Sequence, residues 1–116
     1  MSTTQIAFCQ SGKTIVVAAD ASAPLGVQAP STSSGTSILS GQYRIVNAGS
    51  NTVFLGVGST ATIAQSNTVA PIAGTSAIAI PLVPGAVEIF SFGESSFFSG
   101  LASAATTLYI TPGTGI

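Results

Sequence analysis

Very few side chains in this sequence could take part in acid–base, nucleophilic or metal chemistry. Histidine is absent, which removes the Ser-His-Asp and Cys-His arrangements that use imidazole as a base. The single cysteine, Cys9, leaves no pair for a disulfide and no thiolate zinc site. The ionic side chains are Lys13, Asp20, Arg44, Glu88 and Glu94. This inventory predicts a protein that is not an enzyme and that uses no metal or cofactor.

Two of the carboxylates are close in the sequence, as the paired carboxylates of glycosidases must be in space. Glu88 and Glu94 are six positions apart, across the end of a predicted strand. We interpret Glu94 as a solvated turn residue instead. Glu88 lies mid-strand among apolar residues, where a buried carboxylate would need a partner or water. Arg44 also lies mid-strand, so it is the candidate partner of Glu88 in an ion pair.

The glycines of Gly56-Val57-Gly58-Ser59-Thr60 invite comparison with a phosphate-binding loop. The stretch lacks the Gly-Lys-Ser/Thr ending of such loops, and no helix is predicted after it. We therefore interpret it as the end of a strand.

The low charge of the chain limits what it can bind. Only 4% of the 116 residues are charged, against about 25% in ordinary soluble domains. Two cations cannot build a basic patch, so we expect neither nucleic acid nor an anionic membrane as a partner. A surface made of Ser, Thr, Gly, Asn, Gln and Ala suits a subunit packed into a large assembly, or a surface protein with a neutral exterior.

The sequence shows no pattern of a membrane-spanning helix, although 46% of it is apolar. Its best apolar run, 77–90, contains Pro81, Pro84, Gly85 and Glu88, and no run reaches the required length of about 20 residues. The apolar content instead argues against disorder and for a folded domain.

The residues named above must be positioned by short β-strands. The stretch 42–58 predicts two strands joined by a turn at 47–51, which we interpret as a hairpin. Residues 3–9 alternate in polarity and precede the β-branched run 14–19, which predicts an N-terminal hairpin. Further strands are expected at 77–83 (where Pro81 indicates an edge position or a strand end), at 86–92, and at 106–111, where Pro112-Gly113 ends the strand.

About eight short strands separated by Gly, Pro and Ser turns predict an all-β fold, either a small β-sandwich or a jelly-roll-like barrel. We expect a single domain, 1–116. Within it, the Ser/Thr/Pro-rich segment at about 20–41 predicts a flexible loop or arm, with a short strand near 25–28. The alternative is an arm that becomes ordered against a neighbouring subunit.

The candidate interface comes from this arm and from a pair of aromatic residues. Phe97 and Phe98 are adjacent, so on a strand they point to opposite faces. One of them fits the core, and the other needs a second buried surface or solvent. The candidate interface residues are Phe97, Phe98, Pro24, Leu25 and Val27.

Residues 43–115 contain three segments that resemble small β-rich proteins of tailed bacteriophages and prophages. The first is YRIVNAGSNTVFLGVG, a strand that ends in Asn near a Gly turn. The second, PLVPGAVEIF at 81–90, is a turn followed by a strand. The third is the closing segment TLYITPGTG at 107–115. The resemblance covers about the last two-thirds of the chain, and residues 1–41 contribute nothing to it.

The resemblance implies a virion component, specifically a head decoration (cement) protein on the capsid exterior that is made in the cytoplasm of the host bacterium. Such a protein clamps neighbouring subunits of the major capsid protein, often as a homo-oligomer, with a trimer favoured. The family suggests no catalytic residues. Two alternatives stay open: another virion part, such as a head–tail connector, head fibre base or tail protein, and a carbohydrate-binding module, which the absence of Trp disfavours.

The charge count predicts that stability depends only weakly on pH between about 5 and 9 and on salt, because almost no side chain titrates in that range. Melting temperatures measured across both variables test this. A large shift with either variable would contradict it and would point to Glu88 or Glu94 as a coupled group.

Overall fold

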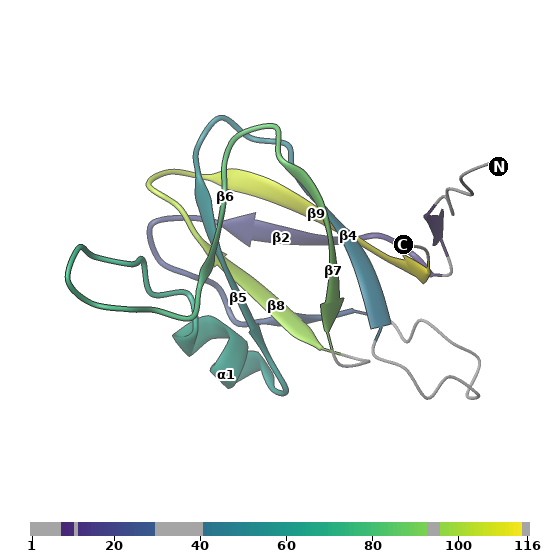
Figure 1. Ribbon diagram of the computed structural model, residues 1–116, viewed down its shortest axis with the longest axis horizontal. Helices are drawn as coiled ribbons and strands as arrows, with labels where there is room; N and C mark the ends of the chain where they lie inside the picture. The colour runs from purple at the N-terminus through teal and green to yellow at the C-terminus, as the bar shows by residue number, and fades with distance from the viewer. Residues whose placement is uncertain (1–7, 11, 30–40, 93–95, 115–116) are drawn as a thin grey trace, which may run out of the picture.

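Two antiparallel β-sheets pack face to face in the computed structural model, which describes residues 8–10, 12–29, 41–92 and 96–114 (Figure 1). Sheet A contains β1 (Cys9–Gln10), β2 (Ile15–Ala19), β9 (Thr106–Thr114), β4 (Gly41–Asn47) and β7 (Val87–Phe92). Sheet B contains β3 (Val27–Gln28), β8 (Phe97–Leu101), β5 (Val53–Gly58) and β6 (Ile80–Leu82). A short helix, α1 (Ala61–Ser66), follows β5.

The strands pair as a long hairpin that has been rolled up. Strand β5 pairs with β6, β4 with β7, β3 with β8, and β2 with β9, all antiparallel. Rolling this ladder adds the pairs β4–β9 and β5–β8, and produces the orders β2-β9-β4-β7 and β3-β8-β5-β6. This is the jelly-roll arrangement, with β1 added to the edge of β9 beside β2. The predicted all-β sandwich is therefore confirmed.

The predicted hairpin at 42–58 is wrong, although both of its strands exist. Strand β4 belongs to sheet A and β5 to sheet B, so the turn between them crosses from one sheet to the other. Each strand has one fully buried face, with Tyr43 and Ile45 on β4 and Val53 and Leu55 on β5. Two such faces bury each other best when the strands oppose one another across the sandwich.

Of the predicted N-terminal hairpin, residues 3–7 lie outside the described part of the chain, and the described residues of its two strands do not pair with each other. Strands β1 and β2 both pair with β9, Gln10 opposite Gly113 and Ile15 opposite Ile110. They run in the same direction along the same edge of β9, opposite the edge that β4 occupies, so β1 and β2 act as two pieces of one edge strand. The prediction that β9 ends before Pro112 is likewise wrong, because the strand continues through Pro112 to Thr114.

Two predictions that were based on proline residues are confirmed. Strand β6, which contains Pro81, lies at the edge of sheet B, where a missing N–H costs no ladder bond. Pro84 and Gly85 form the turn before β7, in which the Ala86 N–H donates to the Val83 carbonyl at 3.0 Å and Gly85 has φ +80°. That positive φ is where a turn of this kind favours glycine.

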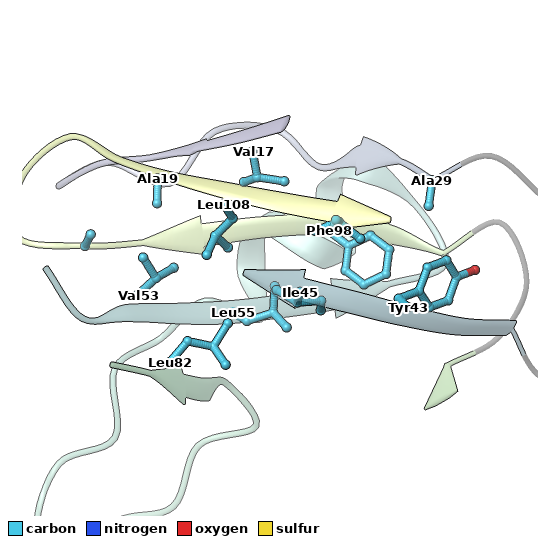
Figure 2. Close-up of a cluster of buried hydrophobic side chains, with 12 residues drawn as sticks. Val17, Ala19, Ala29, Tyr43, Ile45, Val53, Leu55, Leu82, Phe98 and Leu108 are labelled. Atoms are coloured by element: carbon cyan, nitrogen blue, oxygen red, sulfur yellow. The ribbon is translucent and has the colours of Figure 1, made fainter. Parts of the chain in front are cut away.

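The core lies between the sheets and is almost wholly apolar (Figure 2). The largest side chains in it are fully buried, and they come from both sheets: Val17, Tyr43, Ile45, Leu108 and Ile110 from sheet A, and Val53, Leu55, Leu82 and Phe98 from sheet B. One end of the core consists of aromatic side chains. Tyr43 and Phe98 meet edge to face with ring centroids 5.1 Å apart, and Phe92 lies 5.7 Å from Phe98.

Helix α1 lies directly on the outer face of sheet B because β5 carries glycines there. A Cβ at Gly58 would lie 2.7 Å from the Ala64 backbone nitrogen, which is too close for any other residue. Thr60 caps the helix by accepting a hydrogen bond from the Ile63 N–H at 3.2 Å. The expectation that no helix follows Gly58 is therefore wrong, whereas the interpretation of this stretch as the end of a strand is confirmed, because β5 ends at Gly58. The glycines serve close packing of the helix on the strand.

Asn47 is the principal buried polar side chain at the crossing between the sheets, and it is fully buried. Its amide donates to the carbonyls of Asn51 and Leu82, each at 2.9 Å, and its oxygen accepts from the Gly49 N–H at 3.0 Å. One side chain thus ties the end of β4, the turn and the end of β6 together.

We predict that Asn47→Ala lowers the free energy of unfolding by about 2 to 4 kcal/mol, because it leaves buried carbonyl and N–H groups without partners. Denaturant unfolding followed by circular dichroism measures this. Ser50→Ala, in the exposed part of the same turn, is the control and should change little. Equal stability of the two variants would contradict the role of Asn47.

Candidate protein interface

Most of the predicted interface segment is bound to the rest of the fold. The Pro24 carbonyl accepts a hydrogen bond from Ser99 Oγ at 2.6 Å, and the Ala23 carbonyl accepts one from Gln65 Nε2 at 2.8 Å. The Gly26 N–H donates to the Ala61 carbonyl of α1 at 3.0 Å. Of the predicted flexible arm, residues 20–29 therefore follow a defined path and include a strand in the expected place. Residues 30–40 lie outside the described part of the chain.

The five candidate interface residues have different environments. Phe98 is completely buried in the core, so it is not available to a partner. Phe97 points to the opposite face, as predicted, and is half-buried beside α1 and Gly26, so its second buried surface comes from the chain itself. Pro24 is half-buried, whereas Leu25 and Val27 remain exposed at the edge of sheet B.

The structure does not bring Arg44 and Glu88 together. In the β4–β7 pair, Arg44 lies opposite Ile89 and Glu88 lies opposite Ile45. Because neighbouring residues of a strand point to opposite faces, the two side chains leave opposite sides of sheet A. Both are exposed. Glu94 lies outside the described residues. Within the described ranges, no group of three His, Cys, Asp or Glu side chains is placed to hold a metal ion.

The outer face of sheet A carries an apolar row that the sequence analysis missed. Val16 lies opposite Tyr109, Tyr109 opposite Val46, and Val46 opposite Val87, so the row crosses β2, β9, β4 and β7. Val16 is 51% exposed and Val87 50%. The sequence signal was confined to β2, whose run Ile15–Ala19 is apolar on both faces, as in strands that are covered on both sides. On β4 and β9 the neighbours of the row on this face are polar, for example Arg44 and Thr111.

The two sheets differ in how their outer faces are covered. Helix α1 packs on the outer face of sheet B, whereas no helix of the described chain lies on the outer face of sheet A (Figure 1). Beside the apolar row lie Ile89, Arg44 and Thr111, where Thr111 shares a 2.7 Å hydroxyl hydrogen bond with Thr14. A hollow of about 380 Å³ opens there, lined by Phe8, Gln10, Thr14, Arg44 and Thr111.

A second apolar surface is the loop at 68–79 between α1 and β6, which we call the aliphatic loop. It projects from the sandwich (Figure 1) and carries Ile72 and Ile78, exposed by 69% and 72%, together with exposed Val69. A hollow of about 330 Å³ lies beside it, lined by Ala21, Phe54, Ala70, Leu101, Ala102 and Ser103. Loops that face water are seldom this apolar, so the aliphatic loop is a second candidate contact surface.

Comparisons with known proteins identify no relative: no family model, no curated protein and no solved structure matches the chain. A search of the described residues for helices long and apolar enough to span a membrane finds none.

The register of β4 and β7 predicts that Glu88→Gln leaves the free energy of unfolding unchanged, because Glu88 is exposed and lies on the opposite side of the sheet from Arg44. Thermal and denaturant unfolding of this variant and of Arg44→Gln measure the effect. A clear loss of stability shared by both variants would contradict the separation of the two charges.

Proposed function

We propose that this chain is a structural protein of a tailed-phage virion, a decoration (cement) protein that binds neighbouring major capsid subunits on the outside of the head. The observation that carries the proposal is the pair of separate exposed apolar surfaces, the outer face of sheet A and the aliphatic loop, on a domain that is 4% charged. A protein that cements a lattice needs at least two contact surfaces, because it must touch more than one neighbour.

The physical properties of the chain suit this role. Apolar area removed from water contributes about 25 cal/mol per Å², and it does so without the desolvation cost of buried ions. A neutral surface has little charge to desolvate when neighbours cover it. A jelly roll also keeps its backbone hydrogen bonds inside two sheets, so its faces and loops are free to form contacts. The resemblance of residues 43–115 to phage proteins is what suggests a phage origin, because the fold alone would not suggest one.

The first test is the copy number of the chain in purified particles of the phage or induced prophage that encodes it, measured by quantitative mass spectrometry. We expect a number comparable to that of the major capsid protein. A handful of copies would indicate a connector, head fibre base or tail position instead. Complete absence would overturn the virion role and put a carbohydrate-binding module first, to be tested on a glycan array.

The second part of this test uses undecorated heads of the same phage and added protein. Ile72→Asp should abolish or strongly weaken binding to the heads, because it places a charge on the most projecting apolar surface, while leaving the melting temperature unchanged. Ser59→Ala, which is exposed and lies outside the aliphatic loop, is the matched control. Binding of Ile72→Asp at the affinity of the wild type would exclude the aliphatic loop as the contact.

A further inference from the structure

We infer that the hollow at the end of the outer face of sheet A binds an acidic sugar, whose carboxylate is held by Arg44 and whose hydroxyl groups are held by the polar side chains around it. The inference goes beyond the proposed virion role and does not depend on it, because it concerns a small ligand and not a capsid subunit.

The hollow is built by the register of neighbouring strands. Thr14, just before β2, lies level with Thr111 of β9, and Thr111 lies opposite Arg44 of β4, so three polar side chains share one row. In the next row, Gly113 lies opposite Gln10 and has no side chain to fill the space. The volume of about 380 Å³ falls within the range of about 300 to 1,000 Å³ that is usual for small-molecule sites.

Arg44 supplies this hollow with a positive charge that has no counter-ion nearby. Within the described chain, Glu88 leaves the other side of sheet A, and Asp20 lies six positions from Thr14, about 20 Å along extended backbone. The carboxylate of Asp20 also accepts a hydrogen bond from the Ala21 N–H at 2.7 Å. The ligand group that Arg44 is placed to bind is therefore an anion.

A single arginine suits a carboxylate better than a phosphate. The guanidinium group presents its N–H groups in a planar fork that matches the two oxygens of a carboxylate. A phosphate monoester carries close to two negative charges at neutral pH, which one exposed arginine balances only in part. A carboxylate carries one, so the charge of the ligand group and that of the hollow cancel.

The polar groups beside Arg44 both donate and accept hydrogen bonds, as the hydroxyl groups of a sugar do. Thr14 and Thr111 share one 2.7 Å hydrogen bond, which uses one of their two hydroxyl hydrogens and leaves the other to donate to a ligand. Gln10 donates one amide N–H to the Gly12 carbonyl at 2.7 Å and keeps its second N–H and its oxygen. A bare carboxylate, which only accepts, would leave that oxygen unused.

Two further side chains favour a ring that carries hydroxyl groups. Phe8 is half-buried and lines the hollow, so it offers an apolar wall to the C–H groups of a sugar ring. Gln42 lies on the same face as Arg44, and its amide oxygen is buried without a hydrogen-bond partner in the described chain. Buried polar groups are nearly always paired, so this oxygen marks a place where water or a ligand belongs.

The experiment is an NMR titration of the isotope-labelled full chain at neutral pH in about 0.15 M salt. The probes are methyl glucuronide, methyl galacturonide and N-acetylneuraminic acid. We expect at least one of them to shift the backbone amide signals of β1, β9 and β4 in a saturable way. The matching neutral glycosides, and acetate alone, should bind about tenfold or more weakly, because each lacks one half of the recognised group.

Variants separate this site from a general attraction to anions. Arg44→Gln should abolish binding, and Arg44→Lys should restore little of it, because an ammonium group lacks the planar fork. Thr111→Val keeps the shape of the side chain without its hydroxyl group and should weaken binding several-fold. Lys13→Gln is the matched control: it removes the same charge from a residue that does not line the hollow, and it should bind as the wild type does. Circular dichroism confirms the folding of each variant.

Several outcomes would overturn the inference. These are no saturable shift with any of the three acidic sugars, equal affinity for the neutral glycosides or for acetate, and an equal loss of binding in Lys13→Gln and Arg44→Gln. Tighter binding of an acidic peptide than of every acidic sugar would also overturn it, because the carboxylate recognised would then be that of a protein. Particle copy number is measured separately, so a chain that decorates heads and binds no sugar would refute this inference and leave the proposed function standing.

Discussion

The buried amide of Asn47 holds the point at which the chain passes from one sheet to the other. Strand β4 lies between β9 and β7 in sheet A, and β5 lies between β8 and β6 in sheet B, so the crossing joins two central strands. Sheets in a sandwich stand about 10 Å apart, and the turn that spans this gap has few backbone partners of its own. Asn47 supplies them and also binds the Leu82 carbonyl at the end of β6. The hydrogen bonds of this one side chain therefore connect sheet A to sheet B at the junction.

The second organising feature is that the outer face of sheet B is covered by a helix and the outer face of sheet A is not. Glycines at positions 56 and 58 let α1 lie against sheet B, while the equivalent side of sheet A presents valine, isoleucine and tyrosine. Helix α1 thus covers the outer face of sheet B, whereas the apolar side chains on the outer face of sheet A remain exposed. For a domain with five ionic side chains, such surface is the principal means of recognising anything, and the few charges that remain can only orient the contact.

Strands, turns and the fold class could be predicted from local patterns, because alternation and Pro or Gly turns act over a few residues. Strand β7 and the Pro84-Gly85 turn are examples. The pairing of the strands could not be predicted. Nothing local to 42–58 shows that its two strands face each other across the core instead of sharing hydrogen bonds. The same limit applies to Arg44 and Glu88, whose separation depends on a one-residue difference in register. The apolar row joins residues from four strands, so only the assembled sheet reveals it.

The place of β9 has a consequence for how the protein is made. Residues 106–114 occupy the interior of sheet A, with β2 on one side and β4 on the other. While a ribosome is still synthesising the chain, β2 and β4 have emerged but have no strand between them. The pairs β5–β6, β4–β7, β5–β8 and β3–β8 have both of their strands at that time, whereas β2 still lacks β9, the strand it pairs with. Sheet A must therefore close after β9 has emerged, in a late step that depends on distant contacts and is intrinsically slow. Until then the apolar faces of β2 and β4 lack the strand that separates them in the sheet.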